Sequence, residues 1–307
     1  MTIPRVPRLA VGPSSAPDWV RESITEGGAE IVALEDAEAL VWTAPRDADG
    51  LAQALSTNGA LQWVQLPFAG IENFAHLIDT DRLWTCGKGV YAEPVAEMAL
   101  GMMLAGLRGL GTYTRRRSWS GPIGRNLRGA NVTVLGGGGI TESLVRLLRP
   151  FDCRITVVRR QVTAMDGVIE VLPSDRYHEA LPGSDVVVLA LALTKETEGM
   201  IGRDELASME SHTWLVNVAR GRHVVTDELV AALTRGSIGG AALDVTDPEP
   251  LPDDHPLWHL DNCIITPHVG NTPEMAVPLL SERIRQNVRR WARGVELLGP
   301  VHPELGY

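Results

Sequence analysis

Short apolar runs alternate with amphipathic, helix-like stretches along nearly the whole chain. In the first third, β-type runs occur at "RLAVGP", "AEIVAL", "ALVWTA", "LQWVQLP" and "LWTCGK", and helical patterns such as "DWVRESITEG" and "DGLAQALSTN" lie between several of them. Strands separated by helices predict parallel βαβ units. We therefore expect the first third to form a parallel sheet covered by helices.

A second series of the same kind follows a long helix predicted from about Pro94 towards Arg108. Its expected strands are "ANVTVLG", "RITVVRR", "DVVVLALAL", "TWLVNVA", "GGAALDV" and "NCIITPH". The uninterrupted apolar runs in the third and fourth of these are typical of strands buried on both faces of a sheet. A last helix is predicted from about Pro273 to Arg293, before a proline-rich tail.

The two series predict the α/β class, with two Rossmann-like lobes, each built on a parallel sheet. We expect a cofactor lobe at 95–272, inserted into a discontinuous substrate lobe at 1–94 and 273–307. Ligands of open parallel sheets bind at the carboxyl ends of the strands. The active site is therefore expected in a cleft between the lobes, at those strand ends.

Composition narrows the class of protein. The 307 residues suffice for one large or two moderate domains, and 44% hydrophobic with 21% charged residues is typical of soluble globular proteins. The net charge of -10 argues against a nucleic-acid partner, and we interpret the one basic run, Arg115 to Arg117, as a solvated helix end. The richest apolar stretch, from Pro94, contains Glu97 and is too short to span a membrane. Prolines in the first residues argue against a signal peptide.

The cysteines indicate a reducing compartment. Cys86, Cys153 and Cys263 are far apart, odd in number and without CxxC spacing. They predict neither a disulfide framework nor a zinc site, and we expect no metal. A cytoplasmic enzyme fits this pattern.

A strand, a glycine cluster and a helix are predicted at "ANVTVLGGGGITESLVRLL". Gly136, Gly138 and Thr141 occupy the three positions of the G-x-G-x-x-G/A pattern. Glycines there let the backbone approach a pyrophosphate, which the helix N-terminus attracts. Thr141 departs from the pattern, and its bulk predicts looser packing of helix on strand. We predict a dinucleotide site; four glycines in a merely flexible turn are the alternative.

The end of the next strand decides which dinucleotide is expected. An acidic residue about 20 residues after the glycines usually holds the ribose 2′-OH, but here the chain has Arg159 and Arg160. Guanidinium groups can neutralise a 2′-phosphate and cannot accept from a hydroxyl. The pair therefore predicts NADP(H) over NAD(H), with two surface arginines at a strand end as the alternative.

Three later segments resemble the D-isomer-specific 2-hydroxyacid dehydrogenase family. They are "NVARG", "ALDVTDPEPLP" and "TPHVG", in the family's order and joined by a similar "DELVAALTRGSIGGAALDV". Upstream, "WVQLPFAGIENF", "GVYAEPVAEMALGMMLAGLR" and "LTKETEGMIG" are also similar, so the resemblance covers most of the chain. Ala192 stands where the family often has proline, a change expected to have little effect.

The resemblance implies a catalytic set of Arg220, Glu249 and His268. A guanidinium can hold the carboxylate of a 2-keto acid while it polarises the neighbouring carbonyl. A histidine is the usual proton donor to the alkoxide, and a carboxylate on its other nitrogen fixes the tautomer. Taken singly, each residue could be structural. The remaining histidines considered are interpreted as surface or structural: His212, His223, His255 and His259.

Further ligand contacts are implied by the same resemblance. On the cofactor side they are Gly139 and Ile140 at the pyrophosphate, Val218 and Ala219 at the nicotinamide end, and Asp244 at the carboxamide. On the substrate side, the loop with Phe68, Ala69 and Gly70 is implied to bind the substrate carboxylate through its backbone N–H groups, with Arg220.

The sequence thus predicts hydride transfer between NADP(H) and a small 2-hydroxy or 2-keto acid, closest in character to the glyoxylate/hydroxypyruvate reductases. The family also implies a homodimer, formed in part by the arm around Trp119. Two alternatives stay open. A formate- or phosphite-type dehydrogenase shares the architecture, although formate dehydrogenases of the family generally carry glutamine where Glu249 stands. A catalytically weak, cofactor-sensing scaffold of the same fold is the other.

Overall fold

The computed structural model describes residues 5–302, which form two compact units. The first, called here the split unit, comprises the residues up to Tyr91 and those from Thr272 onwards. The second, the inserted unit, is Ala92–Asn271. Residues 1–4 and 303–307 lie outside the described residues; they include the start and the end of the predicted substrate lobe, and most of the proline-rich tail.

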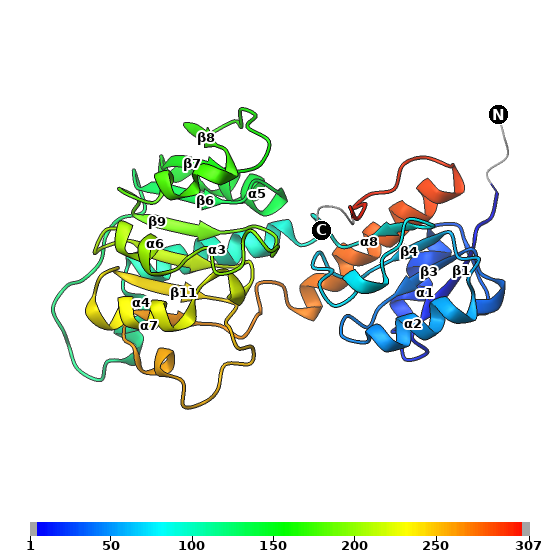
Figure 1. Ribbon diagram of the computed structural model, residues 1–307, viewed down its shortest axis with the longest axis horizontal. Coiled ribbons are helices and arrows are strands. Elements are labelled where there is room, and N and C mark those ends of the chain that lie inside the picture. The colour runs from blue at the N-terminus through cyan, green and yellow to red at the C-terminus, as the bar shows by residue number, and fades with distance from the viewer. Residues whose placement is uncertain (1–4, 303–307) are drawn as a thin grey trace. The chain divides into compact units, whose positions relative to one another are not determined.

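The split unit is a five-stranded parallel sheet with the strand order β2-β1-β3-β4-β5. Its strands are β1 (Arg8–Gly12), β2 (Glu30–Ile31), β3 (Ala39–Trp42), β4 (Trp63–Gln65) and β5 (Leu83–Thr85). Its helices are α1 (Asp18–Glu26), α2 (Ala48–Thr57) and α8 (Pro273–Ala292). In Figure 1 the orange-red helix α8, from the end of the chain, lies with the blue strands from its beginning.

Alternation along β3 explains why this sheet is covered on both faces. Leu40 and Trp42 pack in the cluster that includes α2, whereas Ala39 and Val41 pack in the cluster that includes α1 and α8. Successive strand side chains point to opposite faces. In α8 the buried residues Leu280, Ile284 and Val288 recur every four positions and line the one face that meets the sheet.

The inserted unit is a seven-stranded parallel sheet in the order β12-β11-β10-β9-β6-β7-β8. Its strands are β6 (Asn131–Leu135), β7 (Arg154–Val158), β8 (Glu170–Leu172), β9 (Val186–Leu189), β10 (Trp214–Asn217), β11 (Gly240–Leu243) and β12 (Cys263–Ile265). Its helices are α3 (Ala92–Leu107), α4 (Leu110–Arg115), α5 (Gly139–Leu148), α6 (Arg203–Ser208) and α7 (Thr226–Arg235). The edge strand β8 was not predicted, because three residues, of which only Leu172 is buried, give little periodic signal.

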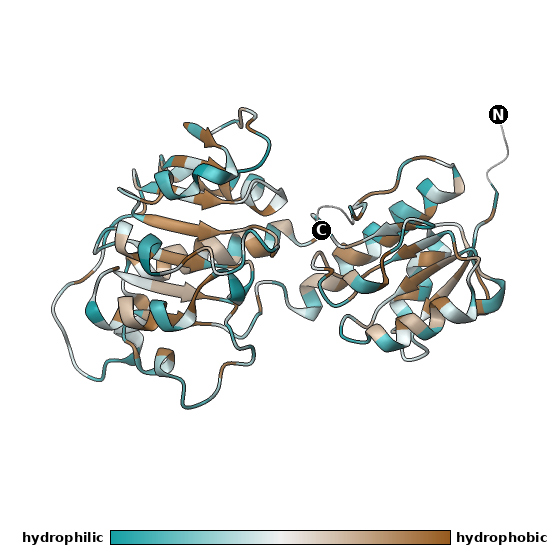
Figure 2. Cartoon of the chain, viewed as in Figure 1, coloured by the Kyte–Doolittle hydropathy of each residue, from teal (hydrophilic) through white to brown (hydrophobic). Residues whose placement is uncertain are grey.

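Helices cover both faces of the seven-stranded sheet as well. Val186 and Val188 of β9 pack with α3 and α5, and Val187 and Leu189 pack with α6 and α7. Strand β9 is accordingly brown, or apolar, in Figure 2. Because every described strand pairing within the two sheets is parallel, the carboxyl ends of neighbouring strands meet at one edge. The predicted fold class is confirmed.

Two smaller points follow from the helices. In the part of the chain that the structure describes, no helix is long and apolar enough to cross a membrane. The basic run does lie at a helix end, since α4 ends at Arg115. The Arg115 guanidinium is only partly solvated, however, because it donates to the carbonyls of Leu260 at 3.1 Å and Cys263 at 2.9 Å.

Candidate active site

His268 and Glu249 are in direct contact at the carboxyl edge of the seven-stranded sheet. Nδ1 of His268 lies 2.8 Å from Oε1 of Glu249. Glu249 is on the segment after β11 and His268 follows β12, so two neighbouring parallel strands lead to the pair. The side chains remain 48% and 35% exposed, which leaves the pair accessible to a ligand. Because the carboxylate accepts from Nδ1–H, the other ring nitrogen, Nε2, is free to exchange a proton.

The loop that carries His268 is held by the buried carboxylate of Asp244, which follows β11. Oδ1 of Asp244 accepts from the Thr266 hydroxyl at 2.6 Å and from the Val269 N–H at 2.9 Å, and Oδ2 accepts from the Gly270 N–H at 2.9 Å. His268 itself has a φ of 55°, a conformation uncommon for residues other than glycine. Such a residue persists where its surroundings fix it. Asp244 therefore positions the imidazole, while its contact with the nicotinamide carboxamide stays a prediction.

Arg220 lies on the loop after β10, and Asn217 sets the shape of that loop. Buried Asn217 accepts from the Ala219 N–H at 3.0 Å and donates to the Arg220 carbonyl at 2.9 Å. Nη1 of Arg220 donates to the carbonyl of Ala219 at 2.7 Å. A Cβ on the next residue, Gly221, would overlap the backbone carbonyl of Thr246. Glycine is therefore required where the loop after β10 meets the loop after β11.

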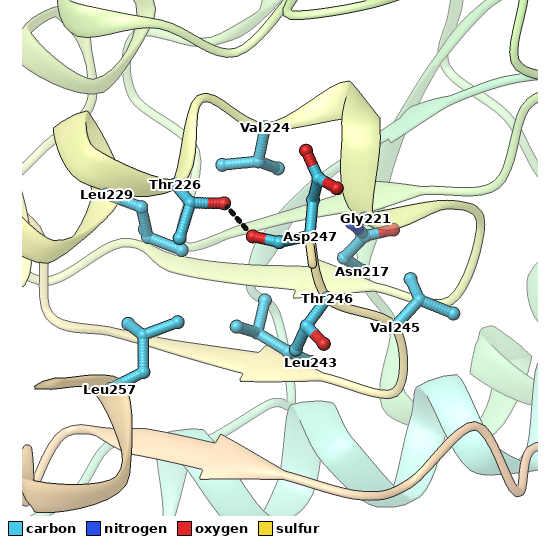
Figure 3. Close-up of a pocket in the computed structure, with 10 residues that line it drawn as sticks. All are labelled: Asn217, Gly221, Val224, Thr226, Leu229, Leu243, Val245, Thr246, Asp247 and Leu257. Atoms are coloured by element: carbon cyan, nitrogen blue, oxygen red, sulfur yellow. Dashed lines mark hydrogen bonds between the residues drawn. The ribbon is translucent and has the colours of Figure 1, made fainter. Parts of the chain in front are cut away.

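A small pocket lies behind these two loops, on the face of the sheet that α7 covers. Figure 3 shows its lining, which is mostly apolar and comes from β10, β11, α7 and nearby loops: Asn217, Gly221, Val224, Thr226, Leu229, Leu243, Val245, Thr246, Asp247 and Leu257. The Thr226 hydroxyl donates to the carbonyl of Asp247 at 2.7 Å. These side chains support the two loops from behind and include none of the predicted catalytic residues.

The glycine cluster connects β6 to α5 and offers a cradle that a dinucleotide fits. Gly136 has a φ of 115° and lies so close to the Ala190 carbonyl that a Cβ would overlap it. Apart from Gly138 and its chain neighbours, no atom of the described residues lies within 4 Å of a Cβ placed on Gly138, so that side of the loop is open. Helix α5 begins at Gly139, which puts the N–H groups of Gly139 and Ile140 in its first turn, without intrahelical acceptors.

Thr141, at the third position of the glycine pattern, is accommodated without loosening the helix. The side chain is fully buried, and its hydroxyl donates to the Gly136 carbonyl at 2.9 Å. Helix α5 packs on the sheet through the buried Leu144, Val145 and Leu148. The expectation of looser packing is not supported, because the added hydroxyl ties the helix to the loop.

Arg159 and Arg160 directly follow β7, the strand beside β6. The Arg159 side chain lies along Gly137: a Cβ on Gly137 would be 2.7 Å from Cβ and Cδ and 2.8 Å from Nε of Arg159. Arg160 is exposed. Arg160 is close enough to Glu196 to influence it. The pKa of the Glu196 carboxyl is lowered mainly by a hydrogen bond with the Thr194 side chain and, to a smaller extent, by the charge of Arg160. The two arginines thus have different surroundings, and Arg159 is the one beside the glycine cluster.

The predicted substrate loop turns its carbonyl groups towards the segment 86–91. Three consecutive carbonyls accept from that segment: Pro67 from the Tyr91 hydroxyl at 2.8 Å, Phe68 from the Gly87 N–H at 2.9 Å, and Ala69 from Sγ of Cys86 at 3.8 Å. The Tyr91 ring also meets the Phe68 ring edge-on, with the centroids 5.9 Å apart. The segment 86–91 therefore holds one side of the substrate loop by hydrogen bonds to the loop's backbone carbonyls.

The opposite side of that loop consequently presents N–H groups. In a trans peptide the C=O group and the following N–H group point in opposite directions. The N–H groups of Phe68, Ala69 and Gly70 are therefore directed away from the segment 86–91. Successive N–H groups on one side of a loop can bind an anion such as a carboxylate. The Phe68 side chain beside them is 43% exposed.

Four residues with a structural role at the site were not predicted: Tyr91, Gly137, Asn217 and Thr266. Asn217 and Thr266 belong to the "NVARG" and "TPHVG" segments, and a polar side chain inside such a motif is a signal for a loop support. Tyr91 and Gly137 carry no such signal, because each acts through a contact with a distant part of the chain.

Metal-binding clusters and disulfides are not features of the described structure. No group of three or more His, Cys, Asp or Glu side chains in residues 5–302 is arranged to hold a metal ion. Cys86, Cys153 and Cys263 are free thiols. Burial raises the pKa of the Cys153 thiol to about 11 and that of the Cys263 thiol to about 12, so both are predominantly protonated near neutral pH.

The parallel sheet, with a glycine cradle and a His–carboxylate pair at the same edge, defines the class of the protein as a dinucleotide-binding α/β oxidoreductase. Residues 100–270 match the family model for the NAD binding domain of D-isomer specific 2-hydroxyacid dehydrogenases. The chain therefore belongs to the D-isomer specific 2-hydroxyacid dehydrogenase family, whose members are NAD(P)-dependent oxidoreductases. The resemblance inferred from the motifs is confirmed.

Individual relatives agree with this membership. A Corynebacterium melassecola protein, described as an uncharacterized protein in the proB 3′ region, is 36% identical over 255 residues, which are 80% of this chain and 84% of that protein. Glyoxylate/hydroxypyruvate reductase A of Photorhabdus laumondii is 30% identical over 231 residues, 74% of this chain and 72% of that protein. A D-isomer specific 2-hydroxyacid dehydrogenase from Xanthobacter autotrophicus, solved with NADPH and MES, is 25% identical with a TM-score of 0.85 and covers 99% of this chain and 100% of its own.

Proposed function

We propose that this protein transfers hydride between NADP(H) and a small 2-hydroxy or 2-keto acid, and that it reduces glyoxylate, hydroxypyruvate or a similar 2-keto acid. The observation that carries the proposal is the 2.8 Å contact between His268 and Glu249, which are accessible and lie at adjoining strand ends. The Photorhabdus relative named for this activity and the NADPH bound by the Xanthobacter protein support the substrate and the cofactor.

The two units divide the work in this proposal. The inserted unit, Ala92–Asn271, is proposed as the dinucleotide-binding domain that the sequence predicts at 95–272. It carries the glycine cluster and the three proposed catalytic residues. The split unit is the substrate domain, because it contains the loop whose N–H groups fit a carboxylate.

Arg220 is the proposed substrate-binding cation. Its guanidinium can bind the substrate carboxylate and polarise the adjacent carbonyl, which makes the carbonyl carbon more electrophilic. In the split unit, the backbone N–H groups of Phe68, Ala69 and Gly70 are proposed as further donors to a substrate carboxylate.

His268 is the proposed acid and base. When bound, reduced nicotinamide supplies a hydride to the carbonyl carbon. The C=O electron pair moves to the oxygen, and that oxygen takes the proton from Nε2 of His268 to give the hydroxyl of the 2-hydroxy acid. The carboxylate of Glu249 stabilises the imidazolium before transfer and keeps the remaining proton on Nδ1. In the oxidation direction the same Nε2 accepts the hydroxyl proton.

The cofactor contacts follow from the cradle. The open side of Gly138 and the helix N–H groups of Gly139 and Ile140 would hold the pyrophosphate, and Arg159 with Arg160 would hold the 2′-phosphate of NADP(H). The backbone of Val218 and Ala219, after β10, would line the nicotinamide end. Asp244 is proposed to contact the carboxamide in addition to supporting the His268 loop.

The decisive experiment is a turnover assay with a matched pair of histidine variants. NADPH oxidation is measured with glyoxylate, hydroxypyruvate, pyruvate and longer 2-keto acids. His268→Ala is expected to lower kcat by roughly 10²- to 10⁴-fold, the usual contribution of a positioned acid–base group. The Kd for NADPH should stay unchanged. His259→Ala, an exposed histidine of the same unit, should retain wild-type kcat.

Two outcomes would contradict the proposal. Absence of turnover with every 2-keto acid would favour a cofactor-sensing scaffold, and a fully active His268→Ala enzyme would mean that the proton donor is another group. Higher kcat/KM with NADH than with NADPH would remove the NADP(H) preference but leave the reaction class intact.

The assembly and compartment are also proposed. We infer a homodimer that uses the arm after α4, where Trp119 is fully exposed and Ile123 is about half exposed. Light scattering of the wild type and of Trp119→Ser over a range of protein concentrations tests this. If Trp119 is in the interface, the variant should already be monomeric at protein concentrations where the wild type is still a dimer. The free thiols support the proposal of a reducing compartment, the cytoplasm.

A further inference from the structure

Gly137 stands at a position that the G-x-G-x-x-G/A pattern leaves open, and its backbone conformation does not require glycine. It occupies the second position, where the pattern accepts any residue. Its φ lies outside the positive range, so a side chain is compatible with the backbone. The absence of a side chain therefore needs another physical reason.

That reason is the side chain of Arg159. A Cβ on Gly137 would lie 2.7 Å from Cβ, 2.7 Å from Cδ and 2.8 Å from Nε of Arg159. The three atoms span the arginine from its base to the first nitrogen of its guanidinium, so this part of the side chain lies along the glycine. Carbon atoms are in favourable contact at about 3.5–4.0 Å, so a methyl group and this arginine conformation exclude each other.

The backbone of Arg159 cannot easily withdraw to make room. Its N–H donates to the Leu172 carbonyl at 3.0 Å, at the end of β8. On the other side, the N–H of Gly136 donates to the Val158 carbonyl at 2.8 Å. Rotation of the Arg159 side chain away from the glycine cluster would relieve the contacts of a Gly137 methyl group with Cδ and Nε, whereas the contact with Cβ would also require a small local shift of the Gly137 loop.

We propose that Gly137 determines cofactor selectivity by leaving space for Arg159 to lie against the glycine cluster, where its guanidinium meets the adenosine 2′-phosphate. This inference rests on the proposed NADP(H) preference. In dinucleotide sites the adenosine ribose lies beside the glycine turn and the end of the next strand, which here carry Gly137 and Arg159. The 2′-phosphate is present in NADP(H) and absent from NAD(H), so displacement of Arg159 affects one cofactor only.

The test compares Gly137→Ala with the wild type by isothermal titration with two fragments, 2′,5′-ADP and 5′-AMP. The fragments share the adenosine and the 5′-phosphate, so 5′-AMP reports general damage to the cradle. Loss of a charge-assisted contact is expected to weaken 2′,5′-ADP about 10- to 100-fold. The affinity for 5′-AMP should change less than about twofold. The ratio of kcat/KM for NADPH to that for NADH should fall by the same factor as the 2′,5′-ADP affinity.

A double-variant comparison isolates the route through the arginine. Arg159→Leu should lower 2′,5′-ADP affinity as Gly137→Ala does, and adding Gly137→Ala to Arg159→Leu should have little further effect, because the shared contact is already lost. The outcomes are separable. If the wild type binds 2′,5′-ADP no more tightly than 5′-AMP, the NADP(H) proposal itself is wrong. If Arg159→Leu removes the preference but Gly137→Ala retains it, or if Gly137→Ala weakens both fragments equally, the role of Gly137 is overturned.

Discussion

Replacement of Asp244 by asparagine should loosen the loop that positions His268, even in the absence of any ligand. The carboxylate is 3% exposed and accepts three hydrogen bonds, from the Thr266 hydroxyl and from the N–H groups of Val269 and Gly270. Asparagine has the same shape but only one oxygen. Whichever way the amide is oriented, at least one of these donors faces an NH₂ group in place of an acceptor.

The size of the effect can be worked from these contacts. One lost hydrogen bond to a charged acceptor is worth about 1.5–3 kcal/mol, and the bonds that remain weaken to the level of neutral ones. Removal of the buried charge recovers part of its desolvation cost. The net loss in the free energy of unfolding of the inserted unit is therefore about 2–4 kcal/mol. The His268 backbone, held at a φ of 55°, should relax, so kcat should fall as well.

The assay uses the protein without cofactor. Denaturant unfolding of the inserted unit gives the stability change, and hydrogen exchange at the amides of Val269 and Gly270 gives the local change. Thr266→Val is the matched control, because it removes only the hydroxyl donor and should cost about 1–2 kcal/mol. Since the two residues share a hydrogen bond, the double variant should cost less than the two single changes together.

The result that refutes this reasoning is equally specific. If Asp244→Asn changes neither the stability nor the exchange of those two amides, the carboxylate does not hold the loop. A rise confined to the Kd for NADPH would then assign Asp244 to the carboxamide contact alone.

Three further changes probe the other parts of the site. Glu249→Gln keeps the shape beside His268 but removes its charge, so kcat should fall about 10²-fold with the NADPH Kd unaltered, and undiminished kcat would exclude the pair as the acid–base unit. Gly221→Ala places a methyl group into the Thr246 carbonyl and should cost about 3 kcal/mol in unfolding free energy, whereas a neutral effect would show that the two loops can separate freely. Tyr91→Phe leaves the Pro67 carbonyl without its buried donor. KM for the 2-keto acid should therefore rise roughly 3- to 10-fold, while kcat and the KM for NADPH stay constant. A change in kcat alone would contradict a role of Tyr91 in holding the substrate loop.

Local pattern was sufficient for most of the architecture. The alternation of apolar runs and helical stretches predicted parallel sheets because strand and helix periodicity depend on neighbouring residues only. Strand β8 was not predicted because it is three residues long and lies at the sheet edge. The local sequence predicted that Thr141 would loosen the packing of the helix on the strand, because it does not reveal that the hydroxyl reaches the Gly136 carbonyl.

For the candidate site as well, the sequence identifies the residues and the tertiary structure decides their contacts. The sequence by itself determined which groups are available: a glycine cluster before a helix, two arginines in place of an acid, and an arginine, a glutamate and a histidine after three strands of one sheet. Only the tertiary structure decided which of them touch, because contacts such as Glu249 with His268 or Gly137 with Arg159 join segments about 20 residues apart. Their geometry depends on strand order and loop packing, which no local pattern of residues encodes.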